Sequence, residues 1–117
     1  MITPAEVKKL ALALPDAQLL DHWGNPSFRV KGKIFATLQV KERTAVLKTS
    51  AEEQETFVAA EPDAFEKIVW GTQTWTRVRL TKVNKVLFHQ LLVSAWKRVS
   101  PKRLVAAFFD GLRQKPG

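Results

Sequence analysis

The chain has 117 residues, of which 45% are hydrophobic and 26% are charged, and this composition indicates a globular domain with its own core rather than a disordered chain. The absence of cysteine excludes disulfides, thiolate zinc sites and cysteine nucleophiles, and every apolar run is shorter than the roughly 20 residues that span a bilayer. The formal charge of +8 at pH 7 favours an anionic partner.

The first predicted element is a helix that begins after Thr3. Thr3 and Glu6 have the spacing of a capping box, and Pro4 suits the first position of a helix. Four apolar residues follow at helical spacing, namely Val7, Leu10, Ala11 and Leu14. We therefore expect this helix to bury one face against a sheet or another helix, and the Pro-Asp pair at 15–16 to end it.

Four short strands are predicted next, over residues 18–21, 27–30, 33–40 and 44–48. The two- and three-residue connections between the last three strands imply antiparallel hairpins. Strict alternation in the segment 33–40 predicts a core face and a face that is at least partly exposed. The core face is expected to carry Ile34, Ala36, Leu38 and Val40, and the other face Lys33, Phe35, Thr37 and Gln39.

A second capping box, formed by Ser50 and Glu53, predicts an acidic helix to about residue 60, with Phe57 as its apolar anchor. Two further strands are predicted over residues 65–70 and 74–80, with a turn between them. Alternation in the second of these strands gives one face with Thr76, Val78 and Leu80, and another with Trp75, Arg77 and Arg79.

The C-terminal part of the chain is predicted to be helical. A long helix from about residue 83 to 99 has a wide apolar stripe that consists of Leu87, Phe88, Leu91, Leu92, Ala95, Trp96 and Val99. A final helix is expected to have Ser100 as its cap and Pro101 at its first position. Its buried face is expected to carry Leu104, Val105, Phe108, Phe109 and Leu112.

The predicted order of elements is α-β-β-β-β-α-β-β-α-α, without an internal repeat or an interdomain linker. This order predicts a single domain over residues 1–117 that belongs to the α+β class. In this domain an antiparallel sheet of hairpins packs against the N-terminal and C-terminal helices.

Several motifs along the chain resemble those of a known family. They are His-Trp-Gly-Asn-Pro-Ser-Phe-Arg-Val at 22–30, Gly-Lys-Ile-Phe-Ala at 32–36, Trp-x-x-Val-x-Leu at 75–80 and the weaker Ala-Trp pair at 95–96. With these motifs the chain resembles the MmcQ/YjbR family over nearly its whole length. Members are small bacterial proteins, labelled as predicted DNA-binding proteins, with a double-wing α+β fold similar to the frataxin-like sheet. The resemblance implies this fold, suggests DNA binding and implies no catalytic residues.

The basic residues are concentrated in the last part of the chain. Residues 68–117 contain ten basic residues and one acidic residue, whereas residues 51–67 contain one basic and six acidic residues. Two predicted hairpin turns also carry cations on flexible stems, which suits contacts with phosphates. The candidate nucleic-acid contacts are Arg29, Lys31, Lys33, Lys41, Arg43, Arg77, Arg79, Lys82 and Lys85. The alternative for the hairpin lysines is a purely solvated role.

Trp75, Arg77 and Arg79 form an alternating aromatic and cationic row that can contact phosphates and stack on exposed bases. In the structural alternative, Trp75 packs beneath a helix and the arginines pair with Glu61, Asp63 or Glu66. A second functional hypothesis is a small-molecule or protein interaction module. Its pocket would be formed by Trp23, Phe28, Trp70 and Trp75, with Arg77 or Arg79 gripping an acidic ligand.

Catalytic and metal sites have little support in the sequence. Asp21 and His22 resemble an acid–base pair, but adjacent residues of a strand point to opposite sides and no nucleophile accompanies them. His22 and His89 lack the spacing of metal ligands. By analogy with frataxin-like folds, the acidic helix offers an iron site at Glu52, Glu53 and Glu55. These residues equally suit the positive end of the helix dipole. Because the sequence shows neither a catalytic group of residues nor the spacing of metal ligands, we expect no cofactor, metal or enzymatic activity.

The leading hypothesis is a non-enzymatic protein that binds DNA, or another polyanion, through contacts with phosphates. We expect a cytoplasmic location without membrane contact, because the first residues lack the apolar core of a secretory signal. The sequence indicates neither an oligomeric state nor a preferred DNA sequence.

Overall fold

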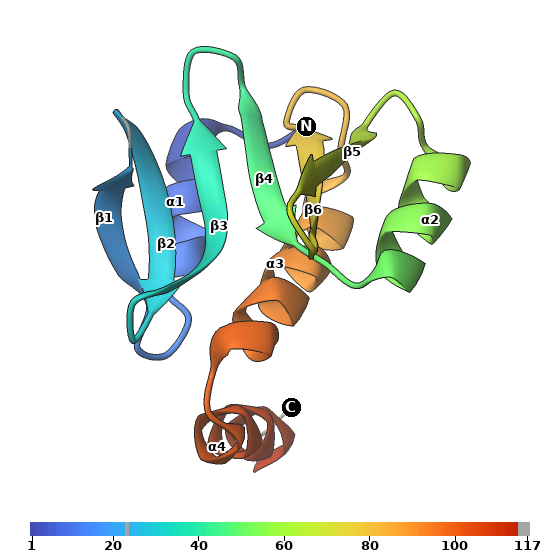
Figure 1. The fold of residues 1–117 in the computed structure, drawn as a ribbon. Coiled ribbons are helices and arrows are strands. Elements are labelled where there is room, and N and C mark those ends of the chain that lie inside the picture. The colour runs from blue at the N-terminus through green and yellow to red at the C-terminus, as the bar shows by residue number, and fades with distance from the viewer. Residues whose placement is uncertain (23, 115–117) are drawn as a thin grey trace.

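The computed structural model describes residues 1–22 and 24–114, and the elements in these residues follow the predicted order (Figure 1). The helices are α1 (Pro4–Leu12), α2 (Ala51–Ala60), α3 (Lys85–Val99) and α4 (Lys102–Gln114). The strands are β1 (Gln18–His22), β2 (Asn25–Val30), β3 (Lys33–Gln39), β4 (Thr44–Lys48), β5 (Phe65–Trp70) and β6 (Gln73–Arg79). The predicted α+β class is confirmed. Among the described residues, no helix combines the length and the apolar character needed to cross a membrane.

The strands of the described chain form one antiparallel sheet in the order β1-β2-β3-β4-β6-β5. Helices α1 and α3 lie behind the sheet in the view of Figure 1, α2 lies beside β5, and α4 lies beyond the end of α3. We call the sheet face without helices the open face. The strand register places on it Ser27, Arg29, Ile34, Thr37, Gln39, Thr44, Val46, Lys48, Glu66, Ile68, Trp70, Trp75, Arg77 and Arg79.

Both predicted capping boxes are present. The Thr3 hydroxyl accepts the N–H of Glu6 at 3.1 Å, and the Glu6 carboxylate accepts the N–H of Thr3 at 3.1 Å. The same reciprocal pair joins Ser50 and Glu53, at 3.0 and 2.9 Å. Asn84 was not predicted as a cap, but its side-chain oxygen caps α3 by accepting two N–H groups of the first turn.

The start of α4 differs from the prediction. The Ser100 hydroxyl donates to the carbonyl of Trp96 at 2.8 Å, and α4 begins only at Lys102. A serine hydroxyl can bond to the carbonyl four residues before it, and here this bond replaces the predicted cap. The chain therefore leaves α3 in an extended conformation at Ser100 and turns into α4 after Pro101.

A β-bulge changes the alternation predicted for β3. Phe28 lies opposite Ala36 and Arg29 lies opposite Ile34, so Phe35 is an extra residue in its strand. An extra residue reverses the alternation of side chains beyond it. Phe35 is consequently buried in the core, while Ile34 is only partly buried on the open face, the reverse of the predicted assignment.

The hydrophobic core lies between the sheet and the helices. Its largest buried side chains include Trp96, Phe28, Phe35, Phe65 and Phe88. Trp96 of α3 donates its indole N–H to the carbonyl of Pro15 at 2.9 Å. Its ring packs edge-on against Phe108 of α4, with 5.0 Å between the ring centroids. Val40 was expected in the core but lies beyond the end of β3 and is 43% exposed.

Candidate nucleic-acid interface

The two hairpin turns with predicted contacts lie at opposite ends of the sheet. Lys31 and Lys33 belong to the β2–β3 turn and its edge, whereas Lys41 and Arg43 belong to the β3–β4 turn. Successive turns of an antiparallel meander alternate between the two ends of a sheet, as Figure 1 shows. The structure therefore separates these cations into two groups.

The β2–β3 turn lies beside the junction between α3 and α4. Lys31 and Gly32 have φ angles of 49° and 81°, as a tight two-residue hairpin with the favoured twist requires. A cavity of about 170 Å³ beside this turn is lined by Lys31, Lys33, Arg98, Val99, Ser100 and Pro101. The fold thus brings three cationic side chains from two distant segments to one small cavity.

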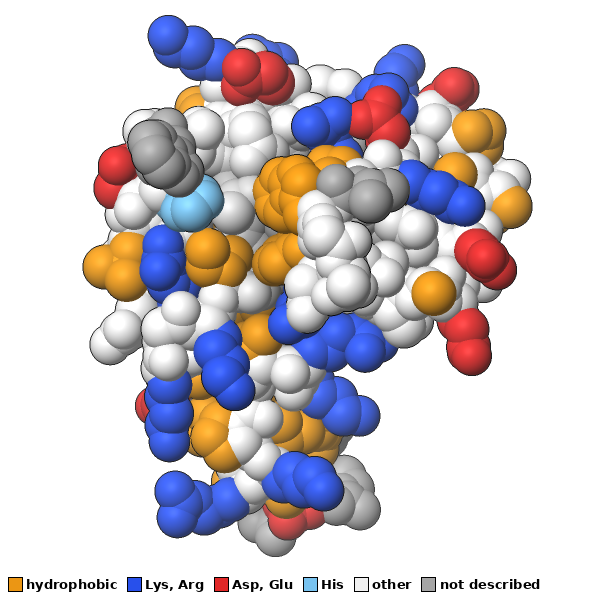
Figure 2. All heavy atoms as spheres, in the orientation of Figure 1, with side chains coloured by type: hydrophobic (Ala, Val, Ile, Leu, Met, Phe, Trp, Pro, Cys, Tyr) orange, Lys and Arg blue, Asp and Glu red, His pale blue; other side chains and the backbone are white. Residues whose placement is uncertain are grey.

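We call this part of the molecule the basic end, and it consists of Lys31, Lys33, Lys97, Arg98, Lys102 and Arg103, all of them exposed. The elements that carry these residues, with their connecting turns, contain one acidic residue in their described parts, Asp110 of α4. Figure 2 shows Lys and Arg side chains gathered over the lower part of the molecule, where α4 lies in Figure 1. Glu53 of α2 pairs with Arg98, so the positive potential of this end comes mainly from its four lysines and Arg103.

The opposite end of the sheet mixes cations with carboxylates. In the β3–β4 turn, Glu42 lies between Lys41 and Arg43. Lys82 lines a cavity of about 350 Å³ together with residues 60–64, which include two acidic residues. A phosphate would meet opposing charges at this end.

Lys85, another predicted contact, is bound to Glu6 of α1. Its Nζ lies 2.8 Å from Oε2 of Glu6. The hydrogen bond from Lys85, with a further one from the N–H of Thr3, lowers the pKa of Glu6 from 4.5 to about 2. Glu6 therefore stays ionised at neutral pH, and a phosphate that approaches Lys85 would have to compete with the Glu6 carboxylate for its ammonium group.

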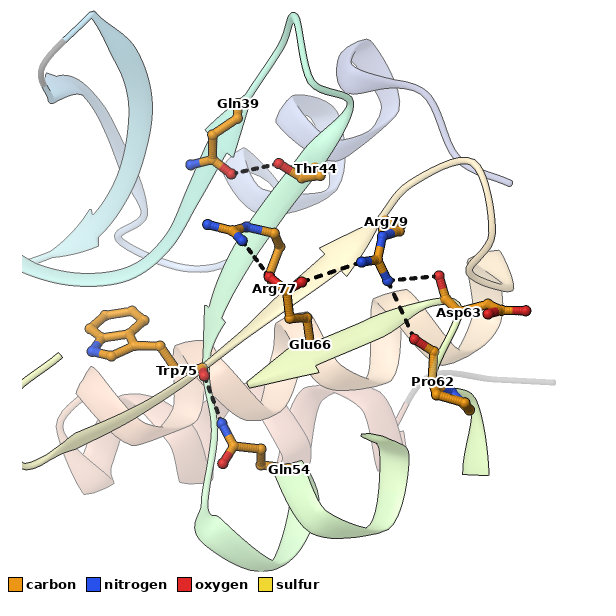
Figure 3. Close-up of polar contacts among 9 residues, drawn as sticks. All are labelled: Gln39, Thr44, Gln54, Pro62, Asp63, Glu66, Trp75, Arg77 and Arg79. Atoms are coloured by element: carbon orange, nitrogen blue, oxygen red, sulfur yellow. Dashed lines mark hydrogen bonds and ion pairs between the residues drawn. The ribbon is translucent and has the colours of Figure 1, made fainter. Parts of the chain in front are cut away.

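Arg77 and Arg79 are held by one carboxylate on the open face. Glu66 of β5 lies between the two guanidinium groups and forms an ion pair with each, at 3.3 Å from Arg79 (Figure 3). Arg79 also donates to the carbonyls of Pro62 and Asp63, at 3.3 and 3.0 Å. The structural alternative, in which these arginines pair with a nearby acidic residue, is confirmed for Glu66.

The centre of the open face is polar and bonded within itself. Arg29 donates from Nε to the hydroxyl of Ser27 at 3.0 Å. Gln39 donates to the hydroxyl of Thr37 at 2.8 Å and accepts from the hydroxyl of Thr44 at 3.1 Å. Ser27 and Thr37 are buried, so the centre of the open face presents the partly exposed Arg29 and Gln39 at its surface.

Two tryptophans pack on each other next to this polar surface. The ring centroids of Trp70 and Trp75 lie 5.4 Å apart, and the Nζ of Lys48 lies 6.0 Å from the Trp75 ring. Trp70 is 49% exposed, whereas Trp75 is 9% exposed. Trp75 does not pack beneath a helix as the structural alternative predicted, because it lies on the face opposite Thr76, which contacts α2 through Gln54.

The aromatic pocket of the second hypothesis does not form as predicted. Phe28 is fully buried in the core and lines no surface pocket. Arg77 and Arg79, the expected grips for an acidic ligand, are engaged by Glu66. Trp23, also assigned to this pocket, lies outside the described residues. The arrangement does not favour this hypothesis.

Asp21 and His22 are arranged as neighbours in a strand. They pair with successive residues of β2, so their side chains leave the sheet on opposite faces, and the Asp21 carboxylate accepts the N–H of Gly24 at 3.3 Å. At the acidic helix, Glu53 is bound by Arg98. Within residues 1–22 and 24–114, no three His, Asp or Glu side chains lie close enough together to hold a metal ion.

Four cations of the basic end were not predicted as contacts from the sequence, namely Lys97, Arg98, Lys102 and Arg103. Their part in the site depends on the β2–β3 turn lying against the α3–α4 junction, which is a contact between segments far apart in the chain. The excess of basic residues after residue 68 was the available signal, and it did not distinguish among them.

Comparisons with known proteins agree with this fold. A crystal structure of the Deinococcus radiodurans protein DR2400, with a DUF419 domain, has 20% sequence identity to this chain and a TM-score of 0.78. The match covers 87% of this chain and 81% of that chain, and it shows a shared fold. A comparison with curated proteins finds no match. The family model named YjbR matches residues 12–98. The chain therefore belongs to the YjbR family, as its motifs indicated.

Proposed function

We propose that the protein is a non-enzymatic DNA-binding protein of the cytoplasm that holds its ligand by the phosphates at the basic end. The observation that carries this proposal is the gathering of six exposed cations at one end of the fold, where their own elements contain one acidic residue in their described parts and Glu53 of α2 pairs with Arg98. A surface of this kind releases condensed counterions when phosphates bind, and this release drives association.

The lysines and the arginine of the cavity have different roles in this proposal. Lys31 and Lys33 carry compact charges on flexible stems, so they can follow a phosphate along the backbone. Arg98 is fixed by Glu53, with 2.8 Å between Nη2 and Oε1, and offers its remaining N–H groups in a set direction. Contacts of this kind position the protein on DNA and carry no sequence information, so we expect binding without sequence preference.

The combined substitution Lys31→Ala and Lys33→Ala is expected to weaken binding to duplex DNA and to flatten its salt dependence. The logarithm of affinity falls with the logarithm of salt concentration by about 0.9 per neutralised phosphate, so the loss of two contacts reduces this slope by about 1.8. A salt titration with a fluorescently labelled duplex, followed by anisotropy, measures the affinity and the slope together.

The matched control is Lys41→Ala with Arg43→Ala. It removes the same charge from two exposed residues of a hairpin turn, but at the other end of the same sheet. We expect this variant to keep the wild-type slope. Absence of binding by the wild type at low salt, or an equal loss of slope in both double variants, would refute the proposal.

A further inference from the structure

The open face carries a large aromatic side chain, Trp70, that is not part of the hydrophobic core. Trp70 is the last residue of β5 and is 49% exposed, on a face whose centre is polar. Its ring rests on Trp75, with 5.4 Å between centroids and 53° between planes. One side of Trp70 is therefore supported by protein, and much of the rest is available to a ligand.

The side chain beneath Trp70 is anchored in the fold by burial and by strand pairing. Trp75 is 9% exposed and lies on β6, between Lys48 of β4 and Ile68 of the edge strand β5. Its carbonyl accepts the side-chain amide of Gln54 at 2.7 Å (Figure 3), which ties this point of β6 to α2. An aromatic ring held in this way loses little conformational entropy when it stacks on another ring.

The aromatic pair and the basic end lie toward the same end of the sheet. The strand register places the end of β4, the start of β6 and the end of β5 at the end where β2 passes into β3. Three strand spacings of about 4.8 Å, or roughly 14 Å, separate β3 from β5 across the sheet. Lys33 pairs with the core residue Val30, whereas Trp70 lies on the open face, so one extended ligand that passes around this end of the sheet is able to contact both.

We propose that Trp70 stacks on an unpaired nucleobase, so that single-stranded nucleic acid is the preferred ligand of this protein. The inference rests on the proposed function, because the phosphates of the same strand bind at the basic end. In a duplex the faces of the bases are covered by their neighbours, so only an unpaired base can offer its face to an indole.

The charges around Trp70 favour a nucleic acid over an apolar partner. Lys48 lies over the Trp75 ring, where its ammonium group is close enough to reach a phosphate beside a stacked base. Arg29 adds a cation to the same face at a greater distance, on β2. A protein partner that buries an apolar patch would have to cover these charges and the polar centre of the face.

The test compares three ligands: an oligothymidylate, an abasic chain with the same number of phosphates, and a duplex. Trp70→Ala is expected to weaken oligothymidylate binding about 5- to 150-fold, the range for loss of one stacked base, and to leave binding to the abasic chain unchanged. Trp70→Phe is expected to retain most of the affinity. Leu20→Ala, which shortens another exposed side chain at 46% exposure, serves as the matched control and is expected to behave as the wild type.

The possible failures are distinguishable. Equal binding of the wild type to oligothymidylate and to the abasic chain, or an equal effect of Trp70→Ala on both, refutes stacking and leaves phosphate binding standing. Failure of the wild type to bind any of the three ligands at low salt refutes the proposed function and this inference together. If Trp70→Ala changes self-association in sedimentation and not DNA affinity, the patch is a protein contact and the inference is wrong.

Discussion

Replacing Trp96 with alanine is expected to destabilise the protein by about 3–5 kcal/mol, as is typical when a buried aromatic side chain is truncated. Trp96 is fully buried, and its indole connects three segments: its own helix α3, the carbonyl of Pro15 after α1, and the ring of Phe108 in α4. The substitution leaves a large cavity and also an unpaired carbonyl. Denaturant unfolding followed by circular dichroism measures the change in free energy.

A second variant separates the two contributions of Trp96. Trp96→Phe keeps an aromatic ring in the core but removes the N–H donor, so we expect a smaller loss of about 1–3 kcal/mol from the unpaired Pro15 carbonyl and imperfect packing. Leu112→Ala, at a side chain that is 51% exposed, is the control and is expected to change stability by less than about 0.5 kcal/mol. A loss below about 1 kcal/mol for Trp96→Ala would show that α3 is not held as described.

The parts of the fold that the sequence predicts well are those decided by neighbouring residues. The capping boxes at Thr3 and Ser50 need only a side chain and a backbone N–H three residues away, and both form. The hairpin at Lys31 and Gly32 depends on a turn that glycine permits at positive φ. Such local interactions do not require knowledge of the rest of the structure.

The wrong predictions depend on which partner a residue takes, and the pattern along its own segment does not decide this. The bulge at Phe35 is defined by pairing with β2, and alternation along β3 alone does not show it. Serine is a favoured residue at a helix N-cap, yet the Ser100 hydroxyl bonds to the carbonyl of Trp96, because α3 continues up to Val99. The residue pattern along one segment therefore predicts the type of the element, but it does not predict the exact strand register or the exact helix boundary.

The candidate site shows the same limit. The alternation of meander turns already separates the Lys31 turn from the Lys41 turn, since consecutive hairpins point in opposite directions. By contrast, the approach of Arg98 to the Lys31 turn follows from how α3 crosses the sheet, which the sequence does not specify. Charge counting located an excess of cations after residue 68, and packing decided which of them gather with Lys31 and Lys33.

Glu53 connects helices α2 and α3, and its substitution is expected to have the second largest effect on stability. Its carboxylate accepts the N–H of Ser50 at 2.9 Å, the hydroxyl of Ser94 at 2.9 Å and a guanidinium N–H of Arg98 at 2.8 Å. Burial raises the pKa of Glu53, but these hydrogen bonds together outweigh burial and bring the pKa below its usual value of 4.5. We expect Glu53→Gln to cost about 1–3 kcal/mol at neutral pH, because the bonds lose their charge.

The lowered pKa fixes how this effect depends on pH. A carboxyl group that binds its proton more weakly in the folded state stabilises the fold above the unfolded pKa, and this stabilisation is lost as pH falls through the folded pKa. Wild-type stability should therefore drop on acidification below pH 4.5, while Glu53→Gln should drop less, so that the two curves converge. Glu55→Gln, at an exposed position of the same helix, is the control and should follow the wild type. Curves for Glu53→Gln and wild type that stay parallel would contradict the role of the Glu53 charge, whereas convergence would support it, and with it the bonds by which this carboxylate joins α2 to Ser94 and Arg98 of α3.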